Sequence, residues 1–494
     1  MTIRTLRRVV QLLFLAFFVW LLYESRRVPP GRLHCSELFL RTDPLSAGTA
    51  ALAGHWSVVF LMIPALVLLV LTLFLGRFFC GWVCPLGTCL DATDKLFARR
   101  HAHYQPRRSW KYYLLGAILV AALMGAQLGW WLDPLPLLER TLVVVFHPLA
   151  LAARDFLAVH ARGPLQALGL RLDPVGHPGY ALGLPVAVVF LTLVGLGAWA
   201  PRFWCRSFCP LGALLGFLGR FAPLRRHVND ECSSCGLCER TCKMGAIPAE
   251  TPERTLTAEC ILCWNCVACP TRANYIGFRR VGNQVDRTLD TRKRAFLQAL
   301  GVGALTGLVL ATGLGRRPRG TRLLRPPGAN RRTASGSLTR MSEEEFRGRC
   351  IRCGACMRAC PTGGLQPVMA EAGFDGVFTP VLVPTVGWCE KECQACGEVC
   401  PTGALQPFAI EEKPEIKLGL ATIHHDQCLS WRLGDQYRSC MVCQEVCQYS
   451  AVEAREIEGQ IRPVVITARC TGCGICENKC PIKPGAAIEV FRAD

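Results

Sequence analysis

Cysteine is the residue type in this sequence whose number and spacing indicate chemistry. The chain contains 30 cysteines, of which 24 form six groups of four and four more form two Cys-x3-Cys-Pro pairs, leaving only Cys35 and Cys89 outside motifs. Secreted disulfide scaffolds are small and spread their cysteines along the chain. Groups as tight as C-x2-C-x2-C-x3-C instead bring several thiolates onto one loop. The spacing therefore predicts shared metal centres, and no CxxCH motif supports covalent c-type haem.

Four of the groups lie in the last third of the chain. Two of them have the bacterial ferredoxin spacing C-x2-C-x2-C-x3-C-P, and the other two lengthen the first gap. Three close cysteines can bind three corners of a [4Fe–4S] cube, and the fourth ligates the neighbouring cluster in two-cluster ferredoxins. Zinc held by four cysteines is the competing interpretation, but trailing Cys-Pro pairs are typical of ferredoxins. The predicted ligands of these [4Fe–4S] clusters are Cys350, Cys353, Cys356, Cys360, Cys389, Cys393, Cys396, Cys400, Cys428, Cys440, Cys443, Cys447, Cys470, Cys473, Cys476 and Cys480.

Two further groups lie between residues 228 and 275. The first has the full ferredoxin spacing, whereas the second has only two residues before its last cysteine, Cys269. Together they predict a two-cluster ferredoxin unit, which makes six [4Fe–4S] clusters in the whole chain. The predicted ligands are Cys232, Cys235, Cys238, Cys242, Cys260, Cys263, Cys266 and Cys269.

The two Cys-x3-Cys-Pro pairs, called the CxxxCP motifs below, are Cys80-Gly-Trp-Val-Cys84-Pro85 and Cys205-Arg-Ser-Phe-Cys209-Pro210. Each follows an apolar segment, and the two segments are expected to run in the same direction, so the four thiols can converge at the edge of a membrane. Soft sulfur ligands suit an iron–sulfur centre, Cu(I) or Zn. A redox-metal site is the favoured hypothesis because Cys232 follows Cys209 closely, and four free buried thiols are the alternative.

The elements that must position these cysteines include several membrane spans. The chain is 51% hydrophobic with a mean hydropathy of +0.27, which is typical of a polytopic membrane protein with soluble parts. An apolar stretch at Leu142–Leu157 carries charged residues, and we expect it to be an interfacial or re-entrant helix. Five segments approach the roughly 20 residues that a spanning helix needs. They are Val9–Tyr23, Val58–Phe79, Tyr112–Leu132, Ala181–Ala200 and Phe296–Leu314.

Charge is distributed unevenly along the chain. The formal net charge is +19, but residues 341–494 are net acidic, so the positive charge lies beside the apolar segments. This pattern follows the positive-inside rule and argues against nucleic-acid binding. Arginines before the first span place the N-terminus on the cytoplasmic side of the membrane, which is expected to be a bacterial inner membrane. The same rule puts the loops after spans two and four, and with them residues 227–290, in the cytoplasm.

The fifth span is expected to lead out of the cytoplasm. Residues 291–298 resemble a twin-arginine export signal with Lys293 in place of the first arginine. Such signals export folded, cofactor-loaded domains, so residues 316–494 are predicted to be periplasmic. An ordinary helix with basic flanks is the alternative interpretation.

These expectations combine into a membrane α-helical bundle with α+β bacterial-ferredoxin-like [4Fe–4S] modules. The predicted order is a four-span membrane domain with both CxxxCP motifs, a two-cluster ferredoxin domain, an export-signal-like fifth span, an arginine-rich linker and a four-cluster ferredoxin domain. Their boundaries are residues 1–226, 227–290, 291–315, 316–346 and 347–494.

At this point the motifs show a family resemblance. Residues 1–275, with CGWVCPLGT, CRSFCPLGALLG and two ferredoxin motifs, resemble the NapH-type membrane ferredoxins of periplasmic nitrate reductase systems. Residues 291–494, with LRPPGA (Leu324–Ala329) and CIRCGACMRACP, resemble the NapG/MauM-type four-cluster ferredoxins. The chain thus resembles a fusion of the two. The resemblance implies a quinol dehydrogenase that takes electrons from menaquinol or ubiquinol and passes them to a periplasmic partner, such as nitrate reductase or a cytochrome.

The residues themselves support electron transfer more directly than they support quinol oxidation. An enzyme in the strict sense needs a quinone site, and the sequence offers only His34, Asp133 and His147 as candidate proton acceptors. An alternative function is suggested by the CcoG/FixG-type polyferredoxins, which are connected with cupric ion reduction and resemble the first half of the chain only. A role in redox assembly or regulation belongs to the same alternative.

Overall fold

The chain folds into two compact units, which are described separately. The first unit contains residues 1–23, 35–141 and 185–314, and the second contains residues 24–34, 142–184 and 315–494. The computed structural model describes residues 2–25, 37–97, 107–162, 179–278, 291–311, 322–332, 338–369, 371–433 and 436–492. His34 and Cys35 lie outside the described residues.

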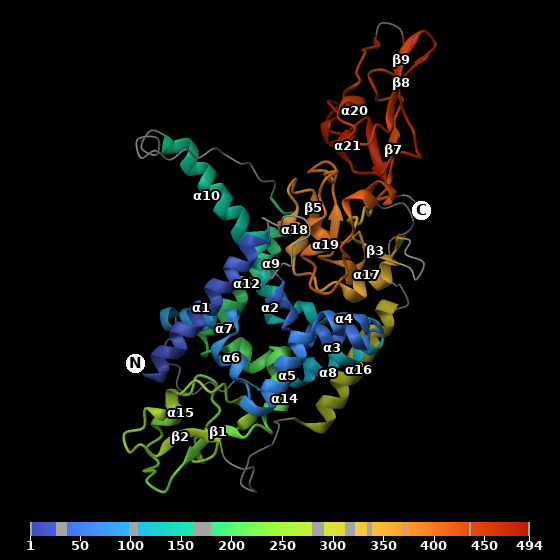
Figure 1. Cartoon of the computed structure of the whole chain (residues 1–494). Coiled ribbons are helices and arrows are strands. Elements are labelled where there is room, and N and C mark those ends of the chain that lie inside the picture. The colour runs from blue at the N-terminus through green and yellow to red at the C-terminus, as the bar shows by residue number, and fades with distance from the viewer. Residues whose placement is uncertain are drawn as a thin grey trace. The chain divides into compact units, whose positions relative to one another are not determined.

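The first unit is mainly helical, and apolar helices form most of it (Figure 1). The helices at predicted spans two, three and four are shorter than expected, and one of these spans is broken by a turn. One such break separates α4 from α5 at Met62. The helices before residue 130 are α1 (Ile3–Glu24), α2 (Leu38–Arg41), α3 (Pro44–Leu52), α4 (Ser57–Leu61), α5 (Ile63–Leu75), α6 (Phe78–Trp82), α7 (Pro85–Phe97) and α8 (Ser109–Leu123). They are followed by η1 (Gly129–Trp131), α9 (Pro134–Thr141), η3 (Leu196–Ala198), α13 (Phe203–Ser207), α14 (Pro210–Gly219) and α16 (Lys293–Ala311), while α12 (Gly183–Gly195) crosses the boundary between the units.

Three helices among the described residues are long and apolar enough to cross a membrane: Ile3–Glu24, Pro134–His160 and Lys293–Leu310. The first and third correspond to predicted spans one and five. The second combines α9, a π-helical turn and α10, so it is longer than the interfacial helix expected at Leu142–Leu157. Shorter apolar helices stand where the other spans were expected, at Ile63–Leu75, Ser109–Leu123 and Gly183–Ala198.

The helix α16 packs closely against α8, and the two run side by side (Figure 1). Gly303 and Gly307 form a Gly-x3-Gly pattern on the contact face. A Cβ atom at Gly303 would lie 2.4 Å from the carbonyl oxygen of Ala117, and one at Gly307 would lie 2.6 Å from Cβ of Met124. Such close approach of backbones through glycine is typical of helix pairs in membranes. The export-signal-like segment is therefore an integral helix of the first unit.

The predicted two-cluster ferredoxin also belongs to the first unit and lies at one end of its helices, at the lower left of Figure 1. Its strands β1 (Leu224–Val228) and β2 (Asn274–Phe278) pair in an antiparallel register from Leu224 with Phe278 to Val228 with Asn274. Between them lie α15 (Leu237–Arg240), η4 (Thr257–Glu259) and η5 (Asn265–Val267).

The second unit consists of short helices and four two-stranded antiparallel sheets. The pairs are β3 (Asn330–Arg332) with β4 (Leu338–Arg340), β5 (Leu365–Pro367) with β6 (Pro380–Leu382), β8 (Val452–Ile457) with β9 (Gln460–Val465), and β7 (Leu420–Ile423) with β10 (Ile488–Phe491). The helices are η2 (Leu142–Phe146), α10 (His147–His160), α17 (Glu343–Arg349), α18 (Ala355–Ala359), η6 (Phe374–Gly376), α19 (Ala395–Glu398), η7 (Ile410–Glu415), α20 (Val442–Glu445) and α21 (Ile475–Lys479). Gly354 and Gly474 begin α18 and α21 with φ near +89° and +84°, a left-handed turn that glycine adopts without strain.

Part of the expected arginine-rich linker is folded into the second unit. Arg325 is buried, because it pairs with the carboxylate of Glu343 and donates to Thr379 Oγ1 at 2.9 Å. Leu324 is also buried and bridges to Leu382 on β6. Residues 322–332 and 338–346 are therefore part of the folded second unit, and the half-buried carboxylate of Glu343 compensates the charge of Arg325.

Candidate iron–sulfur sites

The structure resolves how the four-cysteine groups of the second unit combine. One cavity is lined by the first three cysteines of the first group and the last cysteine of the second group, namely Cys350, Cys353, Cys356 and Cys400. The last cysteine of the first group, Cys360, instead lies close enough to the first three cysteines of the second group to interact with them electrostatically. These three are Cys389, Cys393 and Cys396. Each fourth cysteine therefore lies with the first three of the neighbouring group, the arrangement that two-cluster ferredoxins use to bind their clusters.

The third and fourth groups cross in the same way. A second cavity is lined by Cys447 together with Cys470, Cys473 and Cys476. Conversely, Cys480 lies within electrostatic reach of Cys428, which itself neighbours Cys440 and Cys443. The sequence could not decide this pairing, because it depends on how the chain folds back between the groups.

In the two-cluster unit, the crossed pattern is visible for one of the two sets of four cysteines. A third cavity is lined by Cys242, Cys260, Cys263 and Cys266. The remaining fourth cysteine, Cys269, has the shortened last gap in its motif and is half-buried. A hydrogen bond at 3.3 Å with Thr271 Oγ1 lowers the pKa of the Cys269 thiol to about 7. Its expected partners, Cys232, Cys235 and Cys238, include one buried thiol, Cys238, to which Arg226 donates a hydrogen bond at 3.4 Å.

Crossed ligation makes a prediction that iron content can test. We expect Cys400→Ser and Cys353→Ser each to remove one cluster, and the double variant to lose no more iron than either single variant, because both cysteines face the same cavity. Combining Cys400→Ser with Cys396→Ser should instead remove two clusters, or about eight iron atoms per chain rather than about four. Iron and sulfide analysis of the purified variants measures both. The reverse pattern of additivity would show that each group keeps its own fourth cysteine.

The two CxxxCP motifs come together in the first unit. Cys80 lies on α6 and Cys205 on α13, and Cys84 and Cys209 directly precede α7 and α14. The thiols of Cys80 and Cys84 are both within electrostatic reach of those of Cys205 and Cys209. Three of the four are buried and Cys80 is partly exposed. The convergence expected from the direction of the flanking helices is therefore present.

A fully buried arginine lies on one side of these four thiols. The guanidinium of Arg202 donates to the carbonyl of Cys80 at 2.8 Å and to that of Gly87 at 3.0 Å. It also makes two hydrogen bonds to the carboxylate of Asp91, at 2.8 and 2.9 Å. Because both carbonyls belong to the segment around the first CxxxCP motif, Arg202 joins the second motif to the first.

A second fully buried arginine, Arg77, lies beside Cys209. A Cβ atom at Gly212 would come 2.8 Å from Nη2 of Arg77 and 3.3 Å from Sγ of Cys209. Nη1 of Arg77 donates to the carbonyl of Ala258 and to the carboxylate of Glu259, both at 3.1 Å. Within the described residues, its Nε and Nη2 atoms have no hydrogen-bond partner. Donor atoms are therefore left facing the thiols.

The ion pairs around the thiols hold more cations than acids. One group consists of Arg7, Arg202 and Lys243 with Asp91 and Asp94, and the other consists of Arg77 and Lys111 with Glu259. In each group, as far as the chain is described, one positive charge is in excess. Burial alone would raise the pKa of Asp91 and of Glu259, but the neighbouring cations outweigh burial and lower both pKa values. Burial raises the pKa of the Cys84 and Cys205 thiols, whereas the charge of Arg202 lowers both pKa values, so the cations favour the thiolate form.

Sequence reasoning missed these charged residues and was only partly informative about proton acceptors. The sequence did contain a signal for the charged residues, because a single charge beside an apolar, cysteine-rich segment destabilises the fold unless it is paired. Of the three candidate proton acceptors, Asp133 is fully buried, and Ser46 lies between it and Asp43. His147 is the first residue of α10, and His34 lies outside the described residues.

Two family models match the chain. One, described as a 4Fe-4S binding domain, matches residues 57–101 and 182–229, which contain both CxxxCP motifs. The other, described as a 4Fe-4S dicluster domain, matches residues 349–404, which contain the first two groups of the second unit. Folds and sites together define an iron–sulfur electron-transfer protein of the ferredoxin type.

Similarity to characterised proteins places the chain more narrowly. It belongs to the family of ferredoxin-type proteins that includes the methylamine utilization protein MauM of Paracoccus denitrificans, to which it is 34% identical over 40% of this chain and 84% of that protein. It is also 28% identical to the ferredoxin-type protein NapH of Escherichia coli, over 53% of this chain and 84% of NapH. The methylamine utilization protein MauN of Methylobacillus flagellatus is 28% identical over 48% of this chain and 74% of that protein. No solved structure matches. The resemblance indicated by the motifs is confirmed.

Proposed function

We propose that this chain is a quinol dehydrogenase of a bacterial inner membrane, which passes electrons singly through [4Fe–4S] clusters to a periplasmic redox partner such as a reductase. Three helices of sufficient length and apolarity, together with the similarity to NapH, indicate a membrane protein. The quinol donor, the direction of electron flow and the partner belong to the proposal.

One contact supports the route from the membrane helices to the first ferredoxin unit. The loop of the first CxxxCP motif packs directly on the cysteine loop that begins at Cys260. A Cβ atom at Gly81 would lie 2.1 Å from the carbonyl oxygen of Ile261, and Trp82 Nε1 donates to the carbonyl of Leu262 at 2.9 Å. Electrons that reach the CxxxCP thiols are therefore next to the cavity lined by Cys242, Cys260, Cys263 and Cys266.

The proposed cofactors are six [4Fe–4S] clusters and a further redox centre at Cys80, Cys84, Cys205 and Cys209. We propose that the centre is a cluster, because four thiol groups from the two motifs converge there. Such a cluster accepts and releases one electron at a time. Arg77 and Arg202, both fully buried, would hold positive charge beside the thiolates.

The proposed topology keeps both CxxxCP motifs and residues 227–290 on the cytoplasmic side and residues 316–494 on the periplasmic side. The convergence of the two motifs supports part of this arrangement, because it requires an even number of membrane crossings between Cys84 and Cys205. Of the three apolar helices that the structure describes between the two motifs, α8, Pro134–His160 and α12, only two can therefore cross, and the proposal assigns the crossings to the segments that contain α8 and α12.

The proposal is tested by anaerobic EPR spectroscopy on the detergent-solubilised protein. Menaquinol or ubiquinol is added, and the spectra are compared with those obtained after dithionite. We expect quinol to reduce a subset of the [4Fe–4S] signals. If dithionite alone reduces them, the donor has a lower potential than quinol, and reduction of cupric ion, the CcoG-like alternative, becomes the function to assay.

A further inference from the structure

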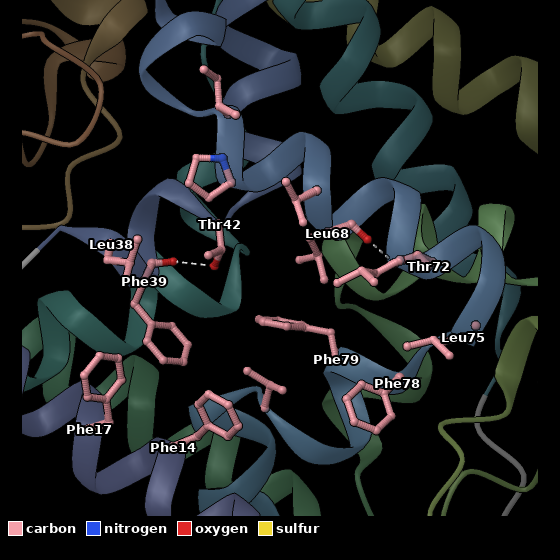
Figure 2. Close-up of a pocket in the computed structure, with 16 residues that line it drawn as sticks. Phe14, Phe17, Leu38, Phe39, Thr42, Leu68, Thr72, Leu75, Phe78 and Phe79 are labelled. Atoms are coloured by element: carbon pink, nitrogen blue, oxygen red, sulfur yellow. Dashed lines mark hydrogen bonds between the residues drawn. The ribbon is translucent and has the colours of Figure 1, made fainter. Parts of the chain in front are cut away.

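The first unit contains an apolar cavity of about 420 Å³ between α1, α2, α5 and α6 (Figure 2). Its size falls within the range of small-molecule binding sites. Thr42 and Thr72 provide its only hydroxyl groups in the described chain, and both already donate to carbonyls of their own segments, at 2.6 and 2.8 Å. The wall therefore presents hydrocarbon and aromatic rings. The rings are those of Phe14, Phe17, Phe39, Phe78 and Phe79.

The cavity adjoins the CxxxCP site. Part of its wall is formed by residues next to the cysteines of the first motif. Phe78 and Phe79 directly precede Cys80, and Val83 directly precedes Cys84. Figure 2 shows the rings of Phe39 and Phe79 entering the cavity from opposite sides. A flat ring held between them would lie next to the segment that carries the redox thiols.

The cavity opens on the surface that the apolar helices present to their surroundings. Ile63, Val67 and Leu71 line it and are each about half exposed. A ligand dissolved in the hydrocarbon of a bilayer can enter here without crossing water, whereas a charged or water-soluble ligand would find no polar partner on the wall.

A buried carboxyl group is adjacent in sequence to one of the lining residues. Asp43 follows Thr42 in sequence, is fully buried, and receives the hydroxyl hydrogen bond of Ser46 at 2.6 Å. Asp133, also fully buried, lies on the other side of Ser46 at 3.4 Å. Burial raises the pKa of both Asp43 and Asp133, and the neighbouring charge of Asp43 raises that of Asp133 further, so the pair favours holding a proton.

We infer that this cavity is the site at which the quinol is bound and oxidised. The inference rests on the proposed function. Each quinol becomes a quinone by losing two electrons and two protons. The electrons leave one at a time to the iron–sulfur centre held by the CxxxCP thiols, and the two protons are released to solvent; the inference assigns their first acceptor to the carboxyl group of Asp43, which follows the lining residue Thr42.

Two valines on the same helix allow a matched test. Val67 and Val70 both lie on α5 and are 54% and 53% exposed, but only Val67 lines the cavity. We expect Val67→Trp to fill the cavity and to slow cluster reduction by decylubiquinol or menadiol at least about tenfold. Reduction by dithionite and the iron content should be unchanged, and Val70→Trp should behave as the parent protein.

The outcomes separate this inference from the function on which it rests. If Val67→Trp is reduced by quinol as fast as the parent, quinol binds elsewhere, and the proposed function stands without this site. If quinol does not reduce the parent either, both are wrong. Should Val67→Trp lose iron, photolabelling of the unmodified protein with an azido-quinone decides: label on α1, α5 or α6 supports the site, and label confined to other segments overturns it.

Discussion

Replacing Cys84 and Cys209 together by serine is expected to abolish the reduction of every [4Fe–4S] signal by quinol. These cysteines come from different motifs and meet in one buried cluster of thiols, so the double change removes two of the four proposed ligands. Reduction by dithionite should persist in the second unit, because its cysteines line separate cavities. Stopped-flow absorbance with decylubiquinol, followed by EPR of the same sample, measures both. We expect no quinol-driven reduction of the variant in the time that quinol needs to reduce the parent protein.

A matched control is available on the neighbouring helix. Cys89 lies on α7, five residues after Cys84, and belongs to neither CxxxCP motif. The variant Cys89→Ser should therefore keep the parental rate of quinol-driven reduction. Parental kinetics in the Cys84 and Cys209 double variant would show instead that the CxxxCP thiols have a structural role, and the electron route would have to begin at the Cys260 group.

Sequence patterns predicted the parts of the sites that neighbouring residues form. They did not predict the parts that form only when distant segments of the chain fold back on one another. The spacing of Cys350, Cys353 and Cys356 already predicts a cluster-binding loop, because three ligands within seven residues need little help from the rest of the chain. The assignment of Cys400 to that loop needed the structure. The same holds for Arg77 and Glu259, which are 182 residues apart and meet only because the ferredoxin unit packs on the apolar helices.

The apolar segments illustrate a second limit. Hydropathy predicted a single helix at Val58–Phe79, but the structure divides it at Met62, where the helix α4 ends and α5 begins. Hydropathy registers that both pieces are apolar and does not register the break. The cavity beside α5 was also invisible to the sequence, since its volume is the space left between helices that are distant along the chain.

Neutralising the carboxylate of Asp91 is expected to reduce the stability of the first unit more than neutralising any other single acidic group in it. It receives hydrogen bonds from Gln11 at 3.0 Å, from Arg202 and from Lys243, and it also pairs with Arg7. These partners lie on α1, next to the second CxxxCP motif and in the ferredoxin unit. In the variant Asp91→Asn, buried guanidinium groups would lose their counter-charge, which typically costs about 3–5 kcal/mol. We expect the variant to unfold at a markedly lower temperature in detergent and to retain less iron.

Asp94 provides the comparison that makes this prediction specific. It is one helical turn further along α7 and equally buried, but it makes only a long ion pair with Lys243 at 3.8 Å and accepts a hydrogen bond from the backbone nitrogen of Arg202 in the described part of the chain. Asp94→Asn keeps an acceptor for that backbone hydrogen bond and should lower the unfolding temperature much less. Equal losses in the two variants would contradict the view that Asp91 neutralises the arginines around the thiols. A larger loss at Asp91, accompanied by loss of the iron bound to the first unit, would tie the buried charges directly to the stability of the CxxxCP site.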